Sequence, residues 1–578
     1  MTAPPPAAQI YSLAEFWLDQ KQTKLHPAEA ALMAAVARGE PCEISPERPE
    51  DKLDDNFIRA EFLAFLARGG SDEAPVTEKG ICLSGAWIER AETPGDPEGL
   101  DMSGAQLHRN LVVCACNIPE QVRLSGAHFS AVDFGGSKLE GLIADGLTAY
   151  NLVLDEGFEA AGPVKLDSAT IGGSLRCTNG RFLGQPLALS CASATIGGNI
   201  LIASGFEAAG EVRIFRTQIT GEVNATGATI TAEDLGLTLN RCKIAGDVYL
   251  TKGFTCAGRV NMGGTSVGAD LSFTGARISG DVRLYRTRVD GTFFWCDVEE
   301  AKAKLNLTSA TMETVNMDRP SWEQPSEILM EDFTYKAFTS LREGCEGAFW
   351  ITWLERQPER YLSRDFRPQP YEQLANVLSS MGHEDEARQV KIERRRRQAH
   401  FNWQNPPAAA SPFGRILRYL SNLWEYVIGV LIDYGHTPGK AVLYLIFMIF
   451  LGTGVFAVAA QQGAMAPTSP LIYNQARGDG AIPKDCAANW TELAGACKTA
   501  MPAEYSEFDP FWYSMDVAIP LINLRQQEDW APRVTHYETG DREWLGWLVR
   551  LWEWGETLAG WLLSLLFVSA VGGLIRRE

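Results

Sequence analysis

The sequence predicts a mainly β fold: a parallel β-helix (solenoid) with helical caps and a C-terminal α-helical membrane module of two spans. An internal repeat is the first observation behind this prediction. Residues 157–164 recur at 205–212 and again at 253–260, so that both steps are 48 residues. The second observation is a pair of uncharged apolar runs, 441–460 and 558–575, of 20 and 18 residues. Runs of this length are typical of membrane-spanning helices.

The repeat also indicates the length of one coil. Ile171, Ile219 and Val267 keep the same 48-residue step, and Ile196 lies about halfway between the first two. One repeat therefore corresponds to two coils of about 24 residues, with inward aliphatic side chains at alternate positions. We predict the β-solenoid over residues 78–318, with roughly ten coils stacked about 4.8 Å apart.

The start of the predicted solenoid contains looser repeats. Leu-Ser-Gly-Ala or Met-Ser-Gly-Ala units begin at Leu83, Met102 and Leu124, with steps of 19 and 22 residues. These units resemble the A-x-L-x-G units of pentapeptide-repeat proteins. The resemblance is one of architecture and implies a stacked parallel coil.

Helical segments flank the predicted solenoid, whose apolar ends need covers. Residues 1–77 are predicted to form a helical N-terminal cap, because apolar residues recur every three or four positions over 56–68 before a Gly-Gly pair. Residues 319–412 are predicted to form a helical hairpin region and a basic linker. The first helix of the hairpin, around 371–378, resembles that of a single tetratricopeptide unit.

Residues 413–578 are predicted to form the membrane module. Its parts are an interfacial helix (414–434), a span (441–460), an outer loop with a re-entrant-like segment (463–545) and a second span (558–575). The interfacial helix alternates apolar blocks with charges, which are costly at bilayer depth and tolerated at its surface.

Basic residues predict the topology. Four consecutive arginines precede the first span: Arg394, Arg395, Arg396 and Arg397. Two further arginines follow the second span. The positive-inside rule therefore places both termini and the solenoid in the cytoplasm. The four consecutive arginines are also candidates for contact with anionic lipid headgroups in the bilayer.

Composition and motifs argue against several classes of function. The formal net charge of −20 disfavours a protein that coats nucleic acid, so no nucleic-acid partner is expected. The seven histidines show no metal-ligand spacing, and no P-loop or G-x-S-x-G motif is present. We therefore predict no catalytic, cofactor-binding or metal-binding residue. Residues 452–457 match G-x-G-x-x-A but fall inside a predicted span, where small residues favour close helix packing.

Cys486 and Cys497 form a candidate disulfide. They lie between the two predicted spans, on the side of the membrane where oxidation is permitted, and they would close a short loop. The closest pair among the other cysteines, Cys114 and Cys116, is interpreted as two buried small apolar side chains.

The segment 508–524 lies between the two spans and is too short to cross a bilayer. It begins with an Asp-Pro helix start, continues with aromatic residues and breaks at a proline. This order resembles the two-span pore module of bacterial ion channels. The resemblance implies pore or re-entrant positions at Asp509, Tyr513, Asp516, Pro520 and Asn523. The glycines of a potassium filter are missing, so potassium selectivity is not implied.

Stretches along most of the chain are similar to a group of uncharacterised bacterial membrane proteins. These proteins combine pentapeptide-like or β-helical repeats with a C-terminal two-span, ion-channel-like module. The matching stretches are residues 58–63, 69–70, 78–80, 85–88, 370–374, 513–516 and 530–532. Together with the predicted topology, this resemblance implies the bacterial inner (cytoplasmic) membrane, with both termini cytoplasmic. Some members carry an automatic label as a membrane-associated oxidoreductase, which no motif in this sequence supports.

Three functions remain open from the sequence. The first is a membrane-anchored cytoplasmic β-solenoid that acts as a binding or scaffolding module for an unknown cytoplasmic protein or small ligand. The second is a channel-like pore gated by the solenoid, which requires a homo-oligomer because two helices cannot shield a broken backbone from lipid. The third is an enzyme with a lateral cleft on the β-helix, where Asp270 and Asp281 are acidic residues at turn positions.

Overall fold

The computed structural model describes residues 24–90, 99–341, 347–405, 412–435, 437–469, 472, 490–491, 505–535 and 543–572. The chain divides into two compact units, Met1–Lys391 and Ile392–Glu578. The first unit contains a long run of short strands, and the second contains two long apolar helices.

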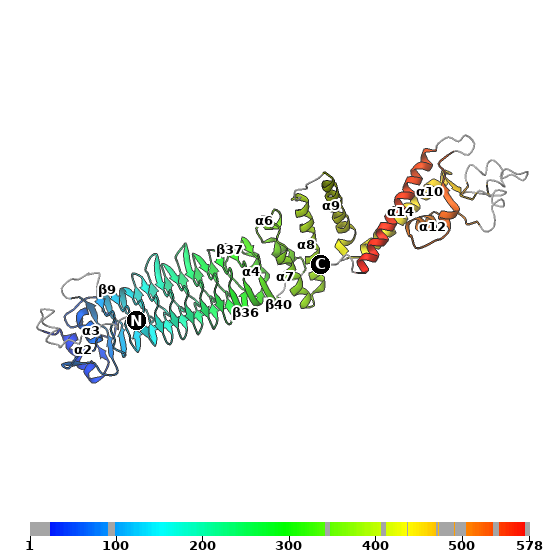
Figure 1. Ribbon diagram of the computed structural model, residues 1–578. Helices are drawn as coiled ribbons and strands as arrows, with labels where there is room; N and C mark the ends of the chain where they lie inside the picture. The colour runs from blue at the N-terminus through cyan, green and yellow to red at the C-terminus, as the bar shows by residue number, and fades with distance from the viewer. Residues whose placement is uncertain are drawn as a thin grey trace, which may run out of the picture. The chain divides into compact units, whose positions relative to one another are not determined.

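The first unit is built around a parallel β-solenoid of about ten turns (Figure 1). Its strands form two long parallel sheets, in which each strand pairs with strands of the coils before and after it. Strands of two or three residues suffice, because a fixed period lets every coil repeat the same backbone hydrogen bonds on its neighbours. The predicted fold class is therefore confirmed.

Each of the two sheets contains 19 strands within the described residues. The first sheet consists of β1 (Cys42–Glu43), β5 (Ile81–Ser84), β8 (Asn110–Cys114), β10 (Ala131–Asp133), β12 (Thr148–Ala149), β13 (Asn151–Val153), β16 (Thr170–Ile171), β17 (Leu175–Arg176), β20 (Thr195–Ile196), β21 (Ile200–Leu201), β24 (Gln218–Ile219), β25 (Val223–Asn224), β28 (Lys243–Ile244), β29 (Val248–Tyr249), β32 (Ser266–Val267), β33 (Leu271–Ser272), β36 (Arg288–Trp295), β38 (Thr311–Met317) and β40 (Thr334–Leu341). The second sheet consists of β2 (Phe57–Arg59), β6 (Trp87–Glu89), β7 (Leu100–Asp101), β9 (Asn117–Arg123), β11 (Lys138–Ile143), β14 (Glu159–Ala160), β15 (Val164–Lys165), β18 (Arg181–Phe182), β19 (Leu187–Ser190), β22 (Glu207–Ala208), β23 (Glu211–Arg213), β26 (Thr229–Ile230), β27 (Leu235–Thr238), β30 (Thr255–Cys256), β31 (Arg259–Asn261), β34 (Arg277–Ile278), β35 (Val282–Arg283), β37 (Lys304–Asn306) and β39 (Glu327–Leu329). The strands thus extend beyond the limits 78–318 at both ends.

The strand register agrees with the 48-residue step. Val164 pairs with Leu189, and Leu189 pairs with Val212, so that Val164 and Val212 lie in alternate coils. On the other sheet, Ile171 pairs with Ile196. All five side chains are buried. Each coil therefore contributes aliphatic residues that it can bury only against its neighbours.

Similar side chains stack on one another along the solenoid. Phe182 lies between Phe158 and Phe206, with ring centroids 5.3 and 5.0 Å apart, a separation at which aromatic rings attract. At one corner, the backbone N–H of Asn199 donates to Ser174 Oγ (3.0 Å). Such side chains supply the hydrogen bonds that the corner backbone would otherwise lack.

The helices α2 (Pro27–Arg38) and α3 (Ala60–Ala67) lie at the N-terminal end of the solenoid (Figure 1). The single helix expected over 56–68 is present only as α3, because Phe57–Arg59 forms β2 and pairs with β6. The apolar residues of segment 56–68 are therefore divided between the sheet and the helical cap. After the Gly-Gly pair at which the helix was expected to end, β3 (Gly70–Ser71) and β4 (Ala74–Pro75) form a short antiparallel hairpin.

Aromatic side chains close the other end of the solenoid. The helices there are α4 (Arg319–Glu323), α5 (Phe349–Glu355), α6 (Glu359–Leu362), α7 (Gln369–Ser380) and α8 (Glu384–Gln404). The ring centroid of Trp322 lies 6.2 Å from that of Trp295 and 5.4 Å from that of Trp353, and all three indoles are buried. These large rings fill the open end of the core. α7 and α8 form helices where the hairpin was expected.

The second unit is mainly helical. Among the described residues its elements are α9 (Pro412–Ile432), the 3-10 turn η1 (Asp433–Gly435), α10 (Gly439–Gln461), β41 (Met465–Pro467), α12 (Pro510–Ala518), α13 (Gln526–Asp529), β42 (Trp530–Pro532) and α14 (Trp544–Val571). By length and composition, α10 and α14 could each cross a membrane, and α12 packs against both (Figure 1). α14 begins before the predicted span 558–575, and the charged residues Glu553 and Glu556 in this earlier part are buried.

Candidate functional site

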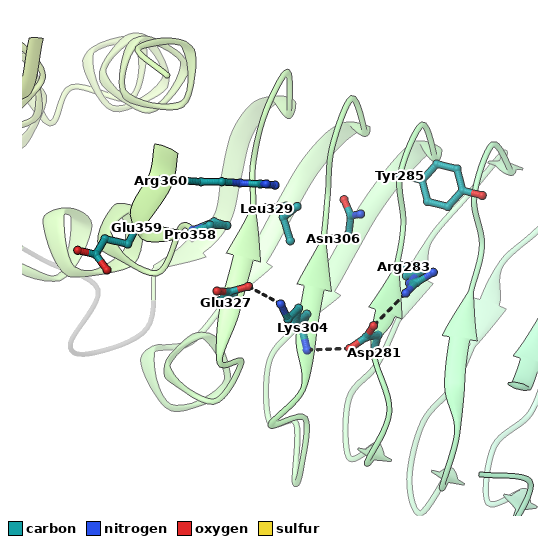
Figure 2. A pocket seen from close by; sticks show the side chains of 10 residues that line it. All are labelled: Asp281, Arg283, Tyr285, Lys304, Asn306, Glu327, Leu329, Pro358, Glu359 and Arg360. Atoms are coloured by element: carbon teal, nitrogen blue, oxygen red, sulfur yellow. Dashed lines mark hydrogen bonds and ion pairs between the residues drawn. The ribbon is translucent and has the colours of Figure 1, made fainter. Parts of the chain in front are cut away.

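A lateral pocket lies on the second sheet of the solenoid, beside α6 (Figure 2). It has a volume of about 730 Å³. The residues that line it are Asp281, Arg283, Tyr285, Lys304, Asn306, Glu327, Leu329, Pro358, Glu359 and Arg360. Because strand residues alternate between core and surface, outward positions of three successive coils, at β35, β37 and β39, meet in one patch. The start of α6 forms the remaining wall.

Two ion pairs lie in this pocket. Arg283 Nη2 is 3.1 Å from Asp281 Oδ2, and Lys304 Nζ is 2.7 Å from Glu327 Oε2. The hydrogen bond to Glu327 raises the pKa of Lys304 above its ordinary value, so this ammonium group is charged at neutral pH. Asp281 and Glu327 each have a cationic partner, so neither is poised as a free general base. The third carboxylate of the lining, Glu359, points away from these ion pairs in Figure 2.

Arg360 differs from the other two cations of the pocket. Its Nη2 donates to Tyr361 Oη (2.8 Å), and its guanidinium carbon lies 4.5 Å from the centroid of the Tyr361 ring. No carboxylate in the described part of the chain pairs with it. Figure 2 shows Arg360 extended over the pocket toward Leu329. This guanidinium group is therefore available to an anionic ligand.

Tyr285 and Asn306 add an aromatic ring and an amide. The Tyr285 ring lies on the backbone of Gly263, where an added Cβ atom would collide with the ring. Asn306 Oδ1 accepts a hydrogen bond from the N–H of Thr308 (2.9 Å), which orients the amide. A ring, an amide and a free guanidinium group together suit a small polar ligand with a negative charge.

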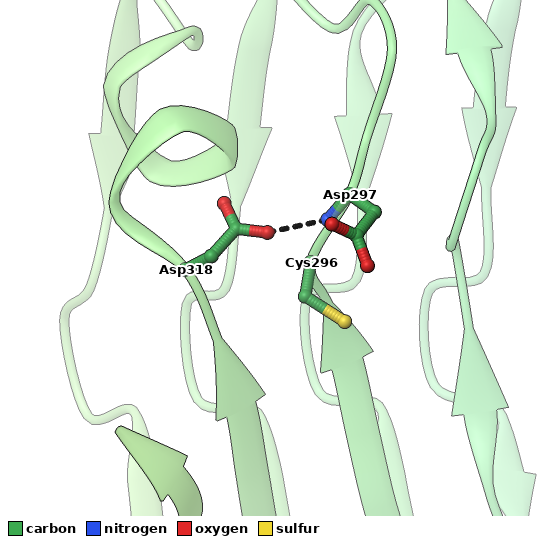
Figure 3. Close-up of side chains that lie close together, drawn as sticks. All are labelled: Cys296, Asp297 and Asp318. Carbon is green, nitrogen blue, oxygen red and sulfur yellow. Dashed lines mark hydrogen bonds between the residues drawn. The ribbon is translucent and has the colours of Figure 1, made fainter. Parts of the chain in front are cut away.

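A second cluster brings Cys296, Asp297 and Asp318 together, with three possible metal-ligand atoms within 4.8 Å of one another (Figure 3). Both oxygens of Asp318 are already engaged. Oδ1 accepts from the Ser321 N–H (2.7 Å), and Oδ2 accepts from the Asp297 N–H (2.5 Å). The first of these bonds caps α4. We therefore interpret this cluster as a helix cap rather than a metal centre.

The residues predicted as pore or re-entrant positions lie in and after α12. Asp509 caps this helix, because its side chain accepts from the N–H groups of Phe511 and Trp512. Tyr513 is buried, and its hydroxyl donates to Glu553 Oε1 (3.2 Å). Pro520 comes shortly after the last residue of the helix, Ala518. The structure thus brings Tyr513 to α14, which the sequence did not indicate.

Asp516 and Asn523 both stabilise the turn after α12. Asp516 Oδ1 accepts from the N–H of Leu524 (2.7 Å), and its Oδ2 accepts from the N–H of Gln527 (2.8 Å). Asn523 is exposed, and its Nδ2 donates to Glu528 Oε1 (2.9 Å). These bonds explain both side chains as local structural contacts, while their position relative to a pore stays a prediction.

Sequence reasoning missed two buried glutamates on α14. Glu553 and Glu556 are 5% and 3% exposed. Glu556 Oε1 lies 2.5 Å from Ser514 Oγ, and Trp552 Nε1 donates to Glu556 Oε2 (2.8 Å). In the sequence, these two glutamates could have been noticed as acidic residues one helical turn apart, just before the apolar run 558–575. Acidic residues inside a span are functional candidates by default.

Gly452 and Gly454 belong to the glycine string that was interpreted as helix packing. At Gly452, an added Cβ atom would collide with Glu556 Oε1 and Ser514 Oγ. At Gly454, nothing lies within 4 Å. Of the two glycines in this string, only Gly452 lies where α10 closely approaches the neighbouring helices.

The four predicted lipid-contact arginines lie on α8. Arg396 Nη2 is 3.6 Å from Asp433 Oδ1, and Arg397 Nε donates to Glu393 Oε1 (2.9 Å). The pKa of Asp433 lies below its ordinary value. Burial alone would raise this pKa, but the nearby positive charges of Lys440 and Arg396 lower it by more. Two of the arginines thus form ion pairs within the chain. Contact of the cluster with lipid stays a prediction.

The candidate disulfide falls on Cys486 and Cys497, which lie outside the described residues. Among the described cysteines, Cys116 is buried and Cys114 is half-buried. Burial raises the pKa of the Cys116 thiol to about 12, which keeps it protonated and unreactive.

In comparisons with known proteins, no protein-family model, no curated protein and no solved structure matches the chain.

Proposed function

We propose that the protein is a membrane-anchored solenoid that binds a small polar, anionic ligand in its lateral pocket. The observation that carries this proposal is the unneutralised Arg360 guanidinium group above a pocket that also presents Tyr285 and Asn306. A cavity of this volume accommodates a small-molecule ligand. An acidic sugar has the matching chemistry, because its ring packs on an aromatic face while its hydroxyl and carboxylate groups meet amide and guanidinium donors.

The second unit is the membrane anchor in this proposal. The two long helices expose large apolar side chains, which include Leu443, Phe447, Phe450, Leu558 and Val568. Exposed apolar surface of this kind is unfavourable in water and suits the hydrocarbon core of a bilayer. The apolar side chains exposed on α9 suit an interfacial position. The basic flanks support an orientation with both termini in the cytoplasm, and the resemblance to bacterial membrane proteins favours a bacterial inner membrane.

A binding role is preferred to a pore because of the turn after α12. The pore hypothesis requires several copies of the chain to satisfy the backbone of a broken segment in lipid. Within one chain, however, Asp516 already accepts hydrogen bonds from the N–H groups of Leu524 and Gln527. The segment therefore has less need of neighbouring copies than its sequence suggests.

A binding role is also preferred to catalysis. Of the two acidic residues considered for a lateral cleft, Asp281 lines the pocket and Asp270 does not. The carboxylate of Asp281 pairs with Arg283, and that of Glu327 pairs with Lys304. Carboxylates held by cations are poor general bases, whereas the same charges orient a polar ligand well.

Calorimetric titration of the full-length protein in detergent tests the proposal. The probes are D-glucuronate, the neutral D-glucose and inorganic sulfate. We expect saturable binding of glucuronate and weaker binding of glucose. Arg360→Gln should weaken glucuronate binding by about tenfold or more, because a hydrogen bond to a charged group contributes about 1.5–3 kcal/mol.

Lys243→Gln is the matched control, because it removes one positive charge from an exposed position on the other sheet. Its affinity for glucuronate should equal that of the unmodified protein. Equal affinities of the Arg360 variant and the unmodified protein, or no binding of any of the three probes, would count against the proposal.

A further inference from the structure

Glu556 lies deep in the second unit, where Ser514 of α12 and Gly452 of α10 face it. Its carboxyl group occupies the space that a side chain at Gly452 would need, since an added Cβ atom would collide with Oε1. An ionised carboxylate in such a buried position is costly unless a cation or sufficient hydrogen bonds balance it.

The hydrogen bonds around Glu556 can be counted. Ser514 Oγ lies 2.5 Å from Glu556 Oε1 and 2.9 Å from the carbonyl oxygen of Ile449. A serine hydroxyl has one hydrogen and can donate to only one of these two oxygens, and a carbonyl oxygen cannot donate. Both contacts are therefore hydrogen bonds at the same time only if Glu556 carries a proton on Oε1 and donates it to Ser514. Trp552 Nε1 donates to the other oxygen (2.8 Å).

Nearby charges distinguish Glu556 from Glu553, one turn away on the same helix. Glu553 Oε2 lies 3.6 Å from Arg550 Nε, and Glu553 Oε1 accepts from the Tyr513 hydroxyl (3.2 Å). Within the described ranges, no cation lies at ion-pair distance from Glu556. Glu553 thus has a cation at ion-pair distance, whereas an ionised Glu556 would have only its contacts to Ser514 and Trp552.

The other charged groups on the packed helices are occupied elsewhere. On α12, the two oxygens of Asp516 accept backbone hydrogen bonds from the following turn. On α10, the only charged residue is Lys440, whose Nζ lies 2.6 Å from Asp433 Oδ2. None of these groups supplies the missing positive charge.

We infer that Glu556 is a binding site for one exchangeable proton inside the anchor. With the proton bound, a chain of two hydrogen bonds runs from Glu556 through Ser514 to the Ile449 carbonyl and links α14, α12 and α10. When the proton leaves, the Ser514 hydrogen turns to the carboxylate and the bond to α10 is lost. Thr453 Oγ1 still donates to that carbonyl (2.7 Å), so the carbonyl keeps a partner while α12 is released. This site does not depend on ligand binding by the solenoid.

Infrared difference spectroscopy tests the inference on the full-length protein in vesicles of phosphatidylcholine and phosphatidylglycerol. A protonated carboxyl group absorbs apart from carboxylates, and its band shifts in D₂O if the proton exchanges. We expect such a band at neutral pH and its loss at alkaline pH. Glu556→Gln should abolish the band, and the matched variant Glu553→Gln should keep it.

Ser514→Ala provides an independent measurement, because it removes the acceptor of the proton and leaves the carboxyl group in place. The band should remain and move to higher frequency. The inference is overturned if the unmodified protein lacks the band at neutral pH, or if the band survives in Glu556→Gln. An unchanged band frequency in Ser514→Ala would overturn it equally, even if the glutamine variant failed to fold.

Discussion

Arg59 and Glu29 form a buried ion pair between β2 and α2, with Arg59 Nη2 2.5 Å from Glu29 Oε2 and side-chain exposures of 2% and 0%. The N–H and Nε of Arg59 both donate to Glu29 Oε1 (3.0 and 2.7 Å). This pair joins the N-terminal helix to the first strand of the second sheet.

Glu29→Gln is expected to destabilise the N-terminal cap by about 3–5 kcal/mol, because it leaves a buried guanidinium group without its counter-charge. Urea unfolding of the full-length protein in detergent, followed by circular dichroism, measures the change. Glu40→Gln is the control, since Glu40 forms an exposed pair with Arg38 and its loss should change stability by no more than about 1 kcal/mol. Similar effects of the two variants would refute the role assigned to the buried pair.

Val212→Asp is expected to destabilise the solenoid by several kcal/mol, because it places an unpaired carboxylate between Leu189 and Leu237 of the neighbouring coils. Thr195→Asp makes the same side chain at an exposed strand position and should have little effect. Thermal unfolding followed by the β signal compares the two. An unchanged unfolding temperature in Val212→Asp would show that the assigned register is wrong.

The repeat could be recognised in the sequence because successive coils place aliphatic residues at the same register, as Ile171 and Ile196 do. The positions of the first and last coils could not be predicted from the repeat, because an end coil has a neighbouring coil on one side only. β2 packs under a helix, and β40 packs its aromatic residues Tyr335 and Phe338 against the closing helices. Neither coil needs to repeat the residues of the interior.

Glu159 should contribute stability that depends on pH. Burial raises its pKa, but hydrogen bonding and charge from Lys138 (2.9 Å) and Arg181 (3.0 Å) outweigh burial, so the folded pKa lies below the ordinary value of 4.5. A carboxyl group with a depressed folded pKa stabilises the fold above its unfolded pKa, and the contribution is lost as the pH falls through the folded pKa.

The expected result is that Glu159→Gln lowers stability at neutral pH by up to about 1 kcal/mol, because both partners are half-exposed and solvent screens the pairs. The difference from the unmodified protein should be complete above the ordinary pKa of 4.5 and should disappear as the pH falls through the lower folded pKa. Glu207→Gln, at a more exposed end of the same ladder of charges, is the control and should have a smaller effect. A difference that persists in acid would contradict the electrostatic origin.

A lateral cleft with Asp281 was one hypothesis from the sequence, but the other residues of the pocket could not be predicted, because they look ordinary one by one. Asp281, Lys304 and Glu327 are 23 residues apart, and only the coil register places them side by side. The glutamates of α14 were missed for a different reason. Charge normally ends a span, whereas here α10 and α12 bury the charged turn, and that depends on tertiary packing.

Gly452→Ala and Gly454→Ala should have opposite effects although the two glycines are close neighbours in α10. At Gly452, the new methyl group would collide with the Glu556 carboxylate and Ser514 Oγ, so we expect a loss of about 1–3 kcal/mol. At Gly454, nothing lies within 4 Å, and alanine should raise stability by up to about 1 kcal/mol because it is the better helix former. Thermal unfolding in detergent, followed by tryptophan fluorescence, measures the stability of both variants.

A Glu556→Ala background tests the contact at Gly452 directly. Because the glutamate side chain is then absent, the stability cost of Gly452→Ala should shrink by more than about 0.5 kcal/mol, the coupling expected of residues in contact. An undiminished cost in that background would mean that α10 does not approach α14 at this glycine.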